Sequence, residues 1–143
     1  MASCDFLPIR NEAFYTCSLM QVIGHLYFPT KTVREVHRIL KFDGKLILTT
    51  LNFADFSNRI NVLIGNIIPG MEQSLLLRFF TWKSLNIFLR KHGFKLEKRR
   101  KWFIPFPLMR IIYKFPAWRK AMTLPAKVLP NYSDSLMGEW RKI

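Results

Sequence analysis

Three histidines are the side chains of this sequence that can exchange a proton near neutral pH, namely His25, His37 and His92. His25 lies five residues after an uncharged apolar run, Phe14–Met20. A neutral imidazole in that place can take a proton from a substrate hydroxyl and make its oxygen a better nucleophile. It can instead cap or hydrogen-bond the loop that follows. His37 falls on an apolar helical stripe and is predicted to be structural, and His92 is predicted to be a cation at a helix end.

Metal or disulfide chemistry is not indicated by the cysteines. Cys4 and Cys17 do not form a CxxC pair, and two cysteines cannot by themselves complete a four-ligand zinc site. Cys17 lies in an apolar stretch, which favours a buried free thiol. The pattern predicts no metal site and fits a reducing, cytoplasmic setting.

The elements that must position His25 follow a strand, helix, strand order. The apolar run Phe14–Met20 is typical of a strand buried on both faces. Thr32 and Glu35 have capping-box spacing, so a helix is predicted over Thr32–Leu40, ended by Asp43-Gly44. Lys45–Thr50 is predicted to be a second strand, parallel to the first.

Later elements continue the α/β pattern. Phe56, Ile60, Leu63 and Ile64 favour one helix before Gly65, and Thr81 is predicted to cap another that ends at Gly93. Phe94–Phe103 and Ser135–Trp140 are predicted strands, and residues 104–130, with five prolines, favour short broken helices.

Composition supports one folded domain of 143 residues, half of them hydrophobic. The formal charge of +14 is uneven: residues 1–50 carry +2, residues 51–100 carry +6 and residues 101–143 carry +6. This excess favours anionic partners, although a generally basic proteome or an absent acidic partner would explain it equally. No apolar run reaches the ~18 residues that a membrane-spanning helix needs, and the N-terminus does not resemble a signal peptide.

Three stretches, in order, resemble the class I S-adenosylmethionine-dependent methyltransferases of the type 11 kind. Residues 7–14, LPIRNEAF, resemble that family's "LPFpdnsFD" stretch. His25-Leu26 and residues 34–52, REVHRILKFDGKLILTTLN, are similar to "EHL…REihRvLKpGGrlilttPN". Residues 78–81, Leu85 and Gly93-Phe94 look like "HirFFT…L…aGF". The resemblance covers about residues 5–95.

The resemblance implies a doubly wound Rossmann-like α/β sheet of seven strands, of which this chain would supply strands four to seven with their flanking helices. On that template residues 1–143 form a single partial domain, with 5–95 the family-like core and 96–143 a basic, proline- and aromatic-rich part with a closing strand. It also implies S-adenosyl-L-methionine as cofactor and a small or lipid-like methyl acceptor. The family's acidic-Gly-x-Gly-x-Gly cofactor loop has no counterpart here, since none of the glycines forms a GxG pair: Gly24, Gly44, Gly65, Gly70, Gly93 and Gly138.

The same resemblance implies the cofactor-binding residues. Asp5 and Phe6 stand where the family places a carboxylate and an apolar side chain against adenine, although a frayed terminus with no role, or a register that puts Ser3 at the Asp position, is the alternative. Leu19, Met20 and Gln21 end the fourth family strand and are expected to line the methyl-donor pocket, because ligands bind outside the carboxyl ends of such strands; Leu19 and Met20 are otherwise plain core. His25 is the expected catalytic base.

Departures from the family pattern predict a diverged acceptor site or a decaying gene. Residues that replace a family residue are Tyr15 for Asp, Gln21 and Gly24 for Glu, Leu51 for Pro and Leu76 for His. Because the glycine-rich cofactor loop is absent, the chain alone is expected to be inactive, and a missing N-terminal half or a homo-oligomer is its expected partner.

A different class of function is a non-catalytic binding module that uses its basic face. Lys98-Arg99-Arg100-Lys101-Trp102 and the cations and aromatics up to Lys120 favour an anionic membrane surface, ahead of RNA because apolar residues are interspersed. A solvated basic face with its aromatics packed inward is the alternative. This second hypothesis would also imply peripheral attachment of the chain to a membrane.

Overall fold

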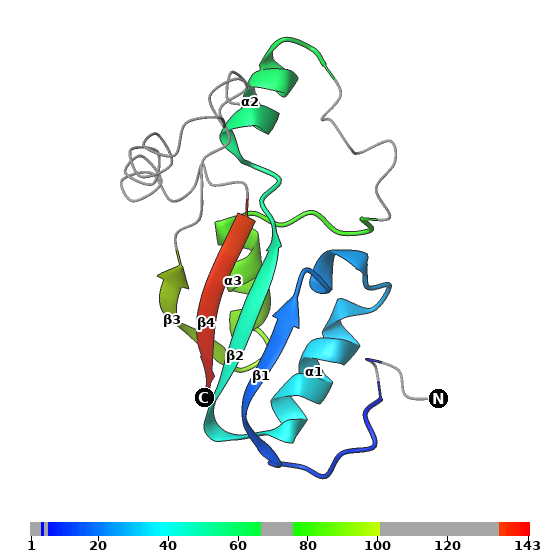
Figure 1. Ribbon diagram of the computed structural model, residues 1–143, viewed down its shortest axis with the longest axis vertical. Coiled ribbons are helices and arrows are strands. Elements are labelled where there is room, and N and C mark those ends of the chain that lie inside the picture. The colour runs from blue at the N-terminus through cyan, green and yellow to red at the C-terminus, as the bar shows by residue number, and fades with distance from the viewer. Residues whose placement is uncertain (1–3, 5, 67–75, 101–134) are drawn as a thin grey trace, which may run out of the picture.

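The structure is a computed structural model that describes residues 4, 6–66, 76–100 and 135–143. These residues form a twisted four-stranded sheet with helices packed against it (Figure 1). The predicted α/β class, a partial Rossmann-like sheet with flanking helices, is confirmed. Residues 101–103 of the predicted third strand, the predicted broken helices of 104–130 and Asp5 lie outside the described residues.

The sheet has the strand order β1-β2-β4-β3. Its strands are β1 (Phe14–Met20), β2 (Leu40–Leu51), β3 (Phe94–Arg100) and β4 (Ser135–Lys142). β1 and β2 are parallel, as predicted, and β4 runs antiparallel to both of its neighbours, β2 and β3. The predicted strand, helix, strand unit at the start of the chain is therefore confirmed.

The helix between the parallel strands, α1 (Pro29–Ile39), begins three residues before the predicted start at Thr32. Pro29 occupies the first turn, where its fixed φ suits a helix and its missing N–H costs nothing. Thr32 is buried inside the helix, and Glu35 accepts hydrogen bonds from Leu7 N and Arg38 instead. The predicted Thr32/Glu35 capping box is wrong, because the proline starts the helix earlier.

The end of α1 also differs from the prediction. The helix stops at Ile39, and Leu40 already belongs to β2, where it pairs with Phe14. Asp43, with φ of +65°, lies within an irregular stretch of β2 and does not cap the helix. Strand pairing at Leu40 and complete burial of its side chain end the helix before the Asp-Gly turn signal is reached.

Three further helices complete the described fold: η1 (Ile23–His25), α2 (Phe56–Leu63) and α3 (Trp82–Arg90). Thr81 caps α3 as predicted, with its side chain accepting from Ser84 N. Gly93 has φ of +80°, and a Cβ there would lie 2.7 Å from His37 Nε2. The turn after α3 therefore needs glycine for its backbone and for the space that His37 fills.

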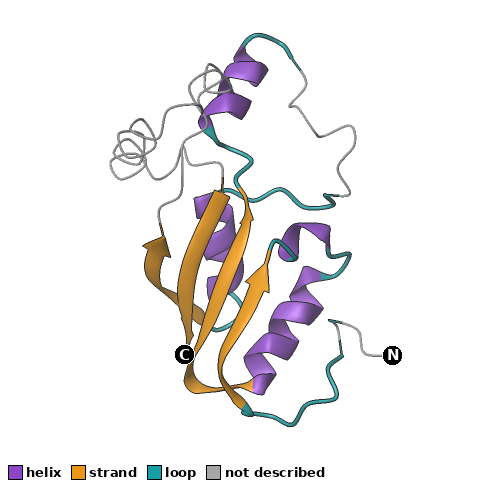
Figure 2. Cartoon of the chain, in the orientation of Figure 1, coloured by secondary structure: helices purple, strands orange, loops and turns teal. Residues whose placement is uncertain are grey.

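One face of the sheet carries the core. Side chains of β2 and β4 alternate toward α1 and α3 and form one buried cluster that includes Val33, Leu46, Leu85 and Trp140. The opposite face bears the ion pairs of Glu97 with Lys45 and Arg141. In Figure 2, α1 and α3 lie beside the strands, whereas α2 lies beyond one end of the sheet. Among the described residues, no helix is long and apolar enough to cross a bilayer.

Candidate functional site

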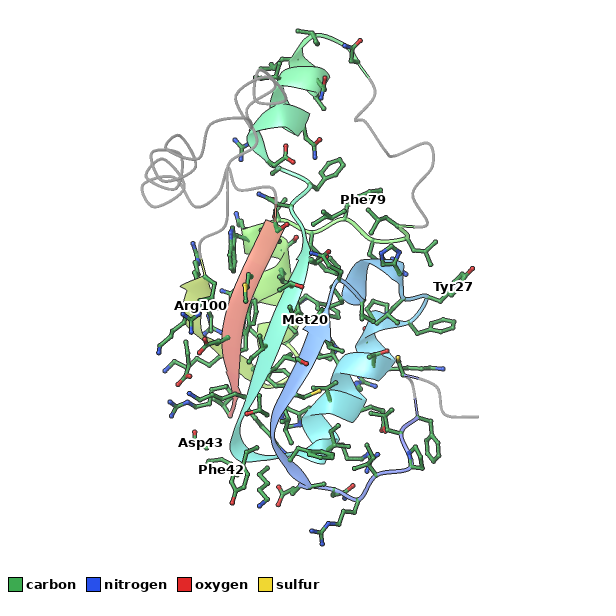
Figure 3. All side chains as sticks on the ribbon, viewed as in Figure 1. Met20, Tyr27, Phe42, Asp43, Phe79 and Arg100 are labelled. Carbon is green, nitrogen blue, oxygen red and sulfur yellow. The ribbon has the colours of Figure 1, made fainter. Side chains whose placement is uncertain are left out.

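The carboxyl end of β1 is where the predicted pocket residues lie. Leu19 faces the core, whereas the Met20 side chain is 53% exposed (Figure 3). Gln21 leaves the strand with φ of +57°, which is uncommon for a residue other than glycine. Its backbone N–H donates to Thr49 O at 3.0 Å, so the exit from β1 is fixed to β2.

Thr49 reinforces this exit with its side chain. Its hydroxyl accepts a second hydrogen bond from Gln21 N at 3.1 Å and lies 3.8 Å from Met20 Sδ. Thr49 was not among the predicted site residues. The signal that indicates it is a pair of threonines at the end of an otherwise apolar strand.

His25 is exposed at the end of η1, just beyond this exit. Its backbone N–H donates to Val22 O at 2.9 Å, and the neighbouring Gly24 O accepts from Leu77 N and Arg78 N. A Cβ on Gly24 would lie 2.7 Å from the Leu76 side chain, so glycine permits the close approach of residues 76–78. The loop that carries His25 is thereby held at the carboxyl-end edge of the sheet.

Two polar residues after β2 were also missed. Asn52 is buried, accepts from Ala54 N through its side chain and pairs with Phe80. Asp55 is the N-cap of α2 and accepts from Asn58 N at 2.6 Å. Their signal in the sequence is the change from apolar strand to Asn and Asp, which favours a turn and a helix start.

An open hollow of about 440 Å³ lies beyond the end of β2, within the size range of small-molecule pockets. Its lining is mostly apolar, with one cation. The residues that line it are Phe53, Ala54, Asn58, Arg59, Val62 and Leu63. The Phe53 and Phe79 rings lie 5.0 Å apart, which joins the hollow to the segment that covers the end of β1.

Residues 7–11 are held against α1 by hydrogen bonds. Arg38 donates to Leu7 O, Ile9 O and the Asn11 side chain, and Glu35 accepts from Leu7 N. The Arg38 guanidinium, helped by the Leu7 amide, lowers the pKa of the Glu35 carboxyl. Residues 7–11 thus have a defined path along α1 (Figure 1).

The structure brings together part of the predicted site. Leu19, Met20, Gln21 and His25 gather at the carboxyl end of β1. Phe6 is exposed on the segment that Arg38 holds, and Asp5 lies outside the described residues. Their roles in cofactor binding and catalysis remain predictions. The described residues contain no group of three or more His, Cys, Asp or Glu side chains that could hold a metal ion.

Comparison with known proteins gives no match to a family profile. An uncharacterized protein of Methanocaldococcus jannaschii, MJ1252, is 30% identical over 115 residues, which cover 67% of this chain and 45% of that protein. A solved S-adenosylmethionine-dependent methyltransferase of Thermotoga maritima, described as a possible histamine N-methyltransferase, superposes with a TM-score of 0.66 at 19% identity. The superposition covers 99% of this chain and 62% of that one.

A second solved structure is the 1,6-didemethyltoxoflavin-N1-methyltransferase of Burkholderia thailandensis with 1,6-didemethyltoxoflavin and S-adenosylhomocysteine bound. Its TM-score is 0.59 at 16% identity, over 99% of this chain and 48% of that one. The chain thus spans about half to two thirds of the length of the proteins that it matches. Its fold is that of the S-adenosylmethionine-dependent methyltransferases.

Proposed function

We propose that this chain forms the acceptor-side part of an S-adenosylmethionine-dependent methyltransferase. The observation that carries the proposal is the exposed exit from β1, where Met20 and the left-handed Gln21 are held by Thr49 at the carboxyl end of a parallel strand pair. Ligands of open α/β sheets bind at such ends. The fold, shared with methyltransferases along 99% of the chain, supports the same assignment.

The residues present fit one side of the cofactor. Met20 offers an exposed apolar contact, and the backbone around Gln21 offers polar groups beside it. When bound, S-adenosylmethionine supplies an electrophilic methyl group on its sulfonium. His25, exposed beyond the same strand end, is proposed to take the proton from an acceptor hydroxyl. Phe6 and Asp5 are proposed to contact adenine from the segment that Arg38 anchors.

The acceptor is proposed to be small or lipid-like, because the hollow beside Phe53 and Leu63 is mainly apolar and contains Arg59. Its size suits an acceptor of modest dimensions, with the apolar wall favouring a hydrocarbon portion.

The 143-residue chain by itself is proposed to bind the cofactor weakly and to be inactive. Its six glycines include no GxG pair that could present backbone amides to the methionine part of the cofactor. Each such hydrogen bond is worth roughly 0.5–1.5 kcal/mol net. Because about 1.4 kcal/mol is tenfold in affinity, the loss of three or four would turn a micromolar site into a millimolar one.

Isothermal titration calorimetry of the purified chain with S-adenosylmethionine tests this function. We expect heats that approach saturation only at millimolar cofactor, and a Met20→Glu variant that binds more weakly still. Saturation in the micromolar range would contradict the proposed weak binding of the cofactor. Equal heats from the unmodified chain and from the Met20→Glu variant would contradict the proposed location of the cofactor site beside Met20.

A further inference from the structure

We infer that the carboxyl-end edge of the sheet is a docking surface for an anionic lipid bilayer. We call it the carboxyl-end surface and define it by six large apolar side chains that are at least one third exposed: Tyr27, Phe28, Phe53, Val62, Leu63 and Phe79. They belong to the elements that follow β1 and β2, including α2 (Figure 1). The inference goes beyond the proposed function and does not require cofactor binding.

The carboxyl-end surface is continuous along the edge. Arg78 donates to Tyr27 O, which ties the loop after η1 to residues 76–80. Phe79 then contacts Phe53, and Phe53 shares the open hollow with Val62 and Leu63. Leu63 is 84% exposed and Tyr27 is 75% exposed, and groups of exposed apolar side chains mark interaction sites. Tyr27 and Phe79 project from this edge in Figure 3.

Charge argues for an anionic occupant. Across residues 20–34, 51–66 and 76–81 the cations are Lys31, Arg34, Arg59 and Arg78, and the sole carboxylate is Asp55. Asp55 is buried and caps α2, so it does not face outward.

Two of these cations lie beside the aromatic and apolar side chains. Lys31 Nζ is 4.7 Å from the centre of the Phe28 ring, and Arg59 lines the hollow with Leu63. Aromatic and aliphatic side chains with Lys or Arg at their margin suit the boundary between acyl chains and anionic headgroups. A partly apolar bilayer surface matches both features of this edge.

The opposite end of the molecule supplies a matched control. Phe42, near the start of β2, is also 75% exposed, and it is followed by Asp43, whose carboxylate pairs with Arg141. Labels at positions 63 and 42 therefore compare two exposed apolar sites that differ in their surroundings. Figure 3 shows Phe42 far from the edge that carries Phe79.

The test uses single-cysteine variants of the full chain, Leu63→Cys and Phe42→Cys, with Cys4→Ser and Cys17→Ala in both. Each carries an environment-sensitive fluorophore and is mixed with phosphatidylcholine vesicles, with or without phosphatidylglycerol, whose acyl chains are brominated. We expect a blue shift and quenching by the bromines for the label at 63 on phosphatidylglycerol vesicles, and no change for the label at 42. Equal responses at the two positions, or none at 63, would overturn the inference.

Two further readouts distinguish bilayer binding through this surface from non-specific attraction by the +14 charge and from binding of another protein copy. Leu63→Glu should weaken cosedimentation with anionic vesicles at raised salt about tenfold, since screening removes long-range attraction and leaves the apolar contact. Phe42→Glu should not, and equal losses in the two variants would overturn the inference. A label at 63 that is already blue-shifted without vesicles would mean that this side chain is covered by protein, and would also overturn the inference.

Discussion

The two ends of the sheet differ in how their charged and large apolar side chains are placed. At the end where β2 begins and β4 finishes, Lys142 is buried and donates to Leu40 O at 2.7 Å, and Arg141 pairs with Asp43 and Glu97. At the carboxyl ends of β1 and β2, large apolar side chains such as Leu63 are exposed instead. The first end thus holds cations in buried or paired positions, beside the exposed Phe42, and the second exposes a larger group of apolar side chains.

Core packing on β2 should give the largest effect on stability. Leu46 is fully buried, so Leu46→Ala should cost about 2–5 kcal/mol, from lost burial and a residual cavity. Ile47→Ala, one residue along on the other, partly exposed face, is the matched control and should cost less. Urea unfolding followed by circular dichroism measures both, and equal costs would contradict the assignment of the core face.

Removing the buried cation should come next. In Lys142→Met, the Leu40 carbonyl at the end of α1 loses its donor, which should cost about 1–3 kcal/mol. Lys95→Met, on the exposed part of β3, should be close to neutral. The same unfolding assay compares them. A neutral Lys142→Met would mean that this end is less tightly organised than the structure indicates.

The Arg38 contacts predict a local effect rather than a global one. Arg38→Leu should release residues 7–11 and speed hydrogen exchange at the Leu7 amide, which now donates to Glu35. Arg34→Leu, an exposed residue of the same helix, is the control. Exchange measured by mass spectrometry should rise in that segment only in the first variant. Unchanged exchange there would show that Arg38 does not fix the segment.

Stability should depend on pH through His37. Burial, followed by the nearby Lys142 charge, lowers the pKa of His37, so the unfolded chain binds a proton more readily than the folded one. Stability is therefore expected to fall as pH drops through the ordinary histidine pKa of about 6.5. Thermal unfolding is measured from about pH 8 to about pH 5, a range that brackets this pKa. The loss of stability over that range should be smaller for His37→Gln than for the unmodified chain. Parallel curves for the two proteins would contradict this origin.

The smallest effect is expected at the carboxyl-end surface. Leu63→Ser removes an 84% exposed side chain and should change the free energy of unfolding by no more than about 0.5 kcal/mol. A large loss in urea unfolding would mean that Leu63 is part of the core and that the two ends of the sheet do not differ as described.

Much of the fold was predictable because strong local signals agreed with tertiary packing. Phe14–Met20 is a strand with the predicted bounds, and Thr81 caps α3 as expected, whereas the helix ends at Arg90, three residues before the predicted end at Gly93. The limits of α1 were not predictable from capping signals, because Pro29 at one end and pairing of Leu40 with Phe14 at the other outweighed them.

The site was predictable only in part. Resemblance located the strand end that carries Met20 and Gln21, but the hydrogen bonds of Thr49 to that exit depend on the register between β1 and β2. Exposure of the apolar residues on α2 likewise depends on what packs beside them, since their spacing alone equally suits a buried helix face.

The central claim is that ligand binds at the carboxyl end of β1. Nuclear magnetic resonance of the isotope-labelled chain, titrated with S-adenosylhomocysteine, tests it most directly. We predict amide shifts at Leu19, Met20 and Gln21 that grow through the millimolar range, with the Glu139 and Arg141 amides of β4 unchanged. Shifts confined to β4, or none at Gln21 when ligand is in large excess, would contradict the account.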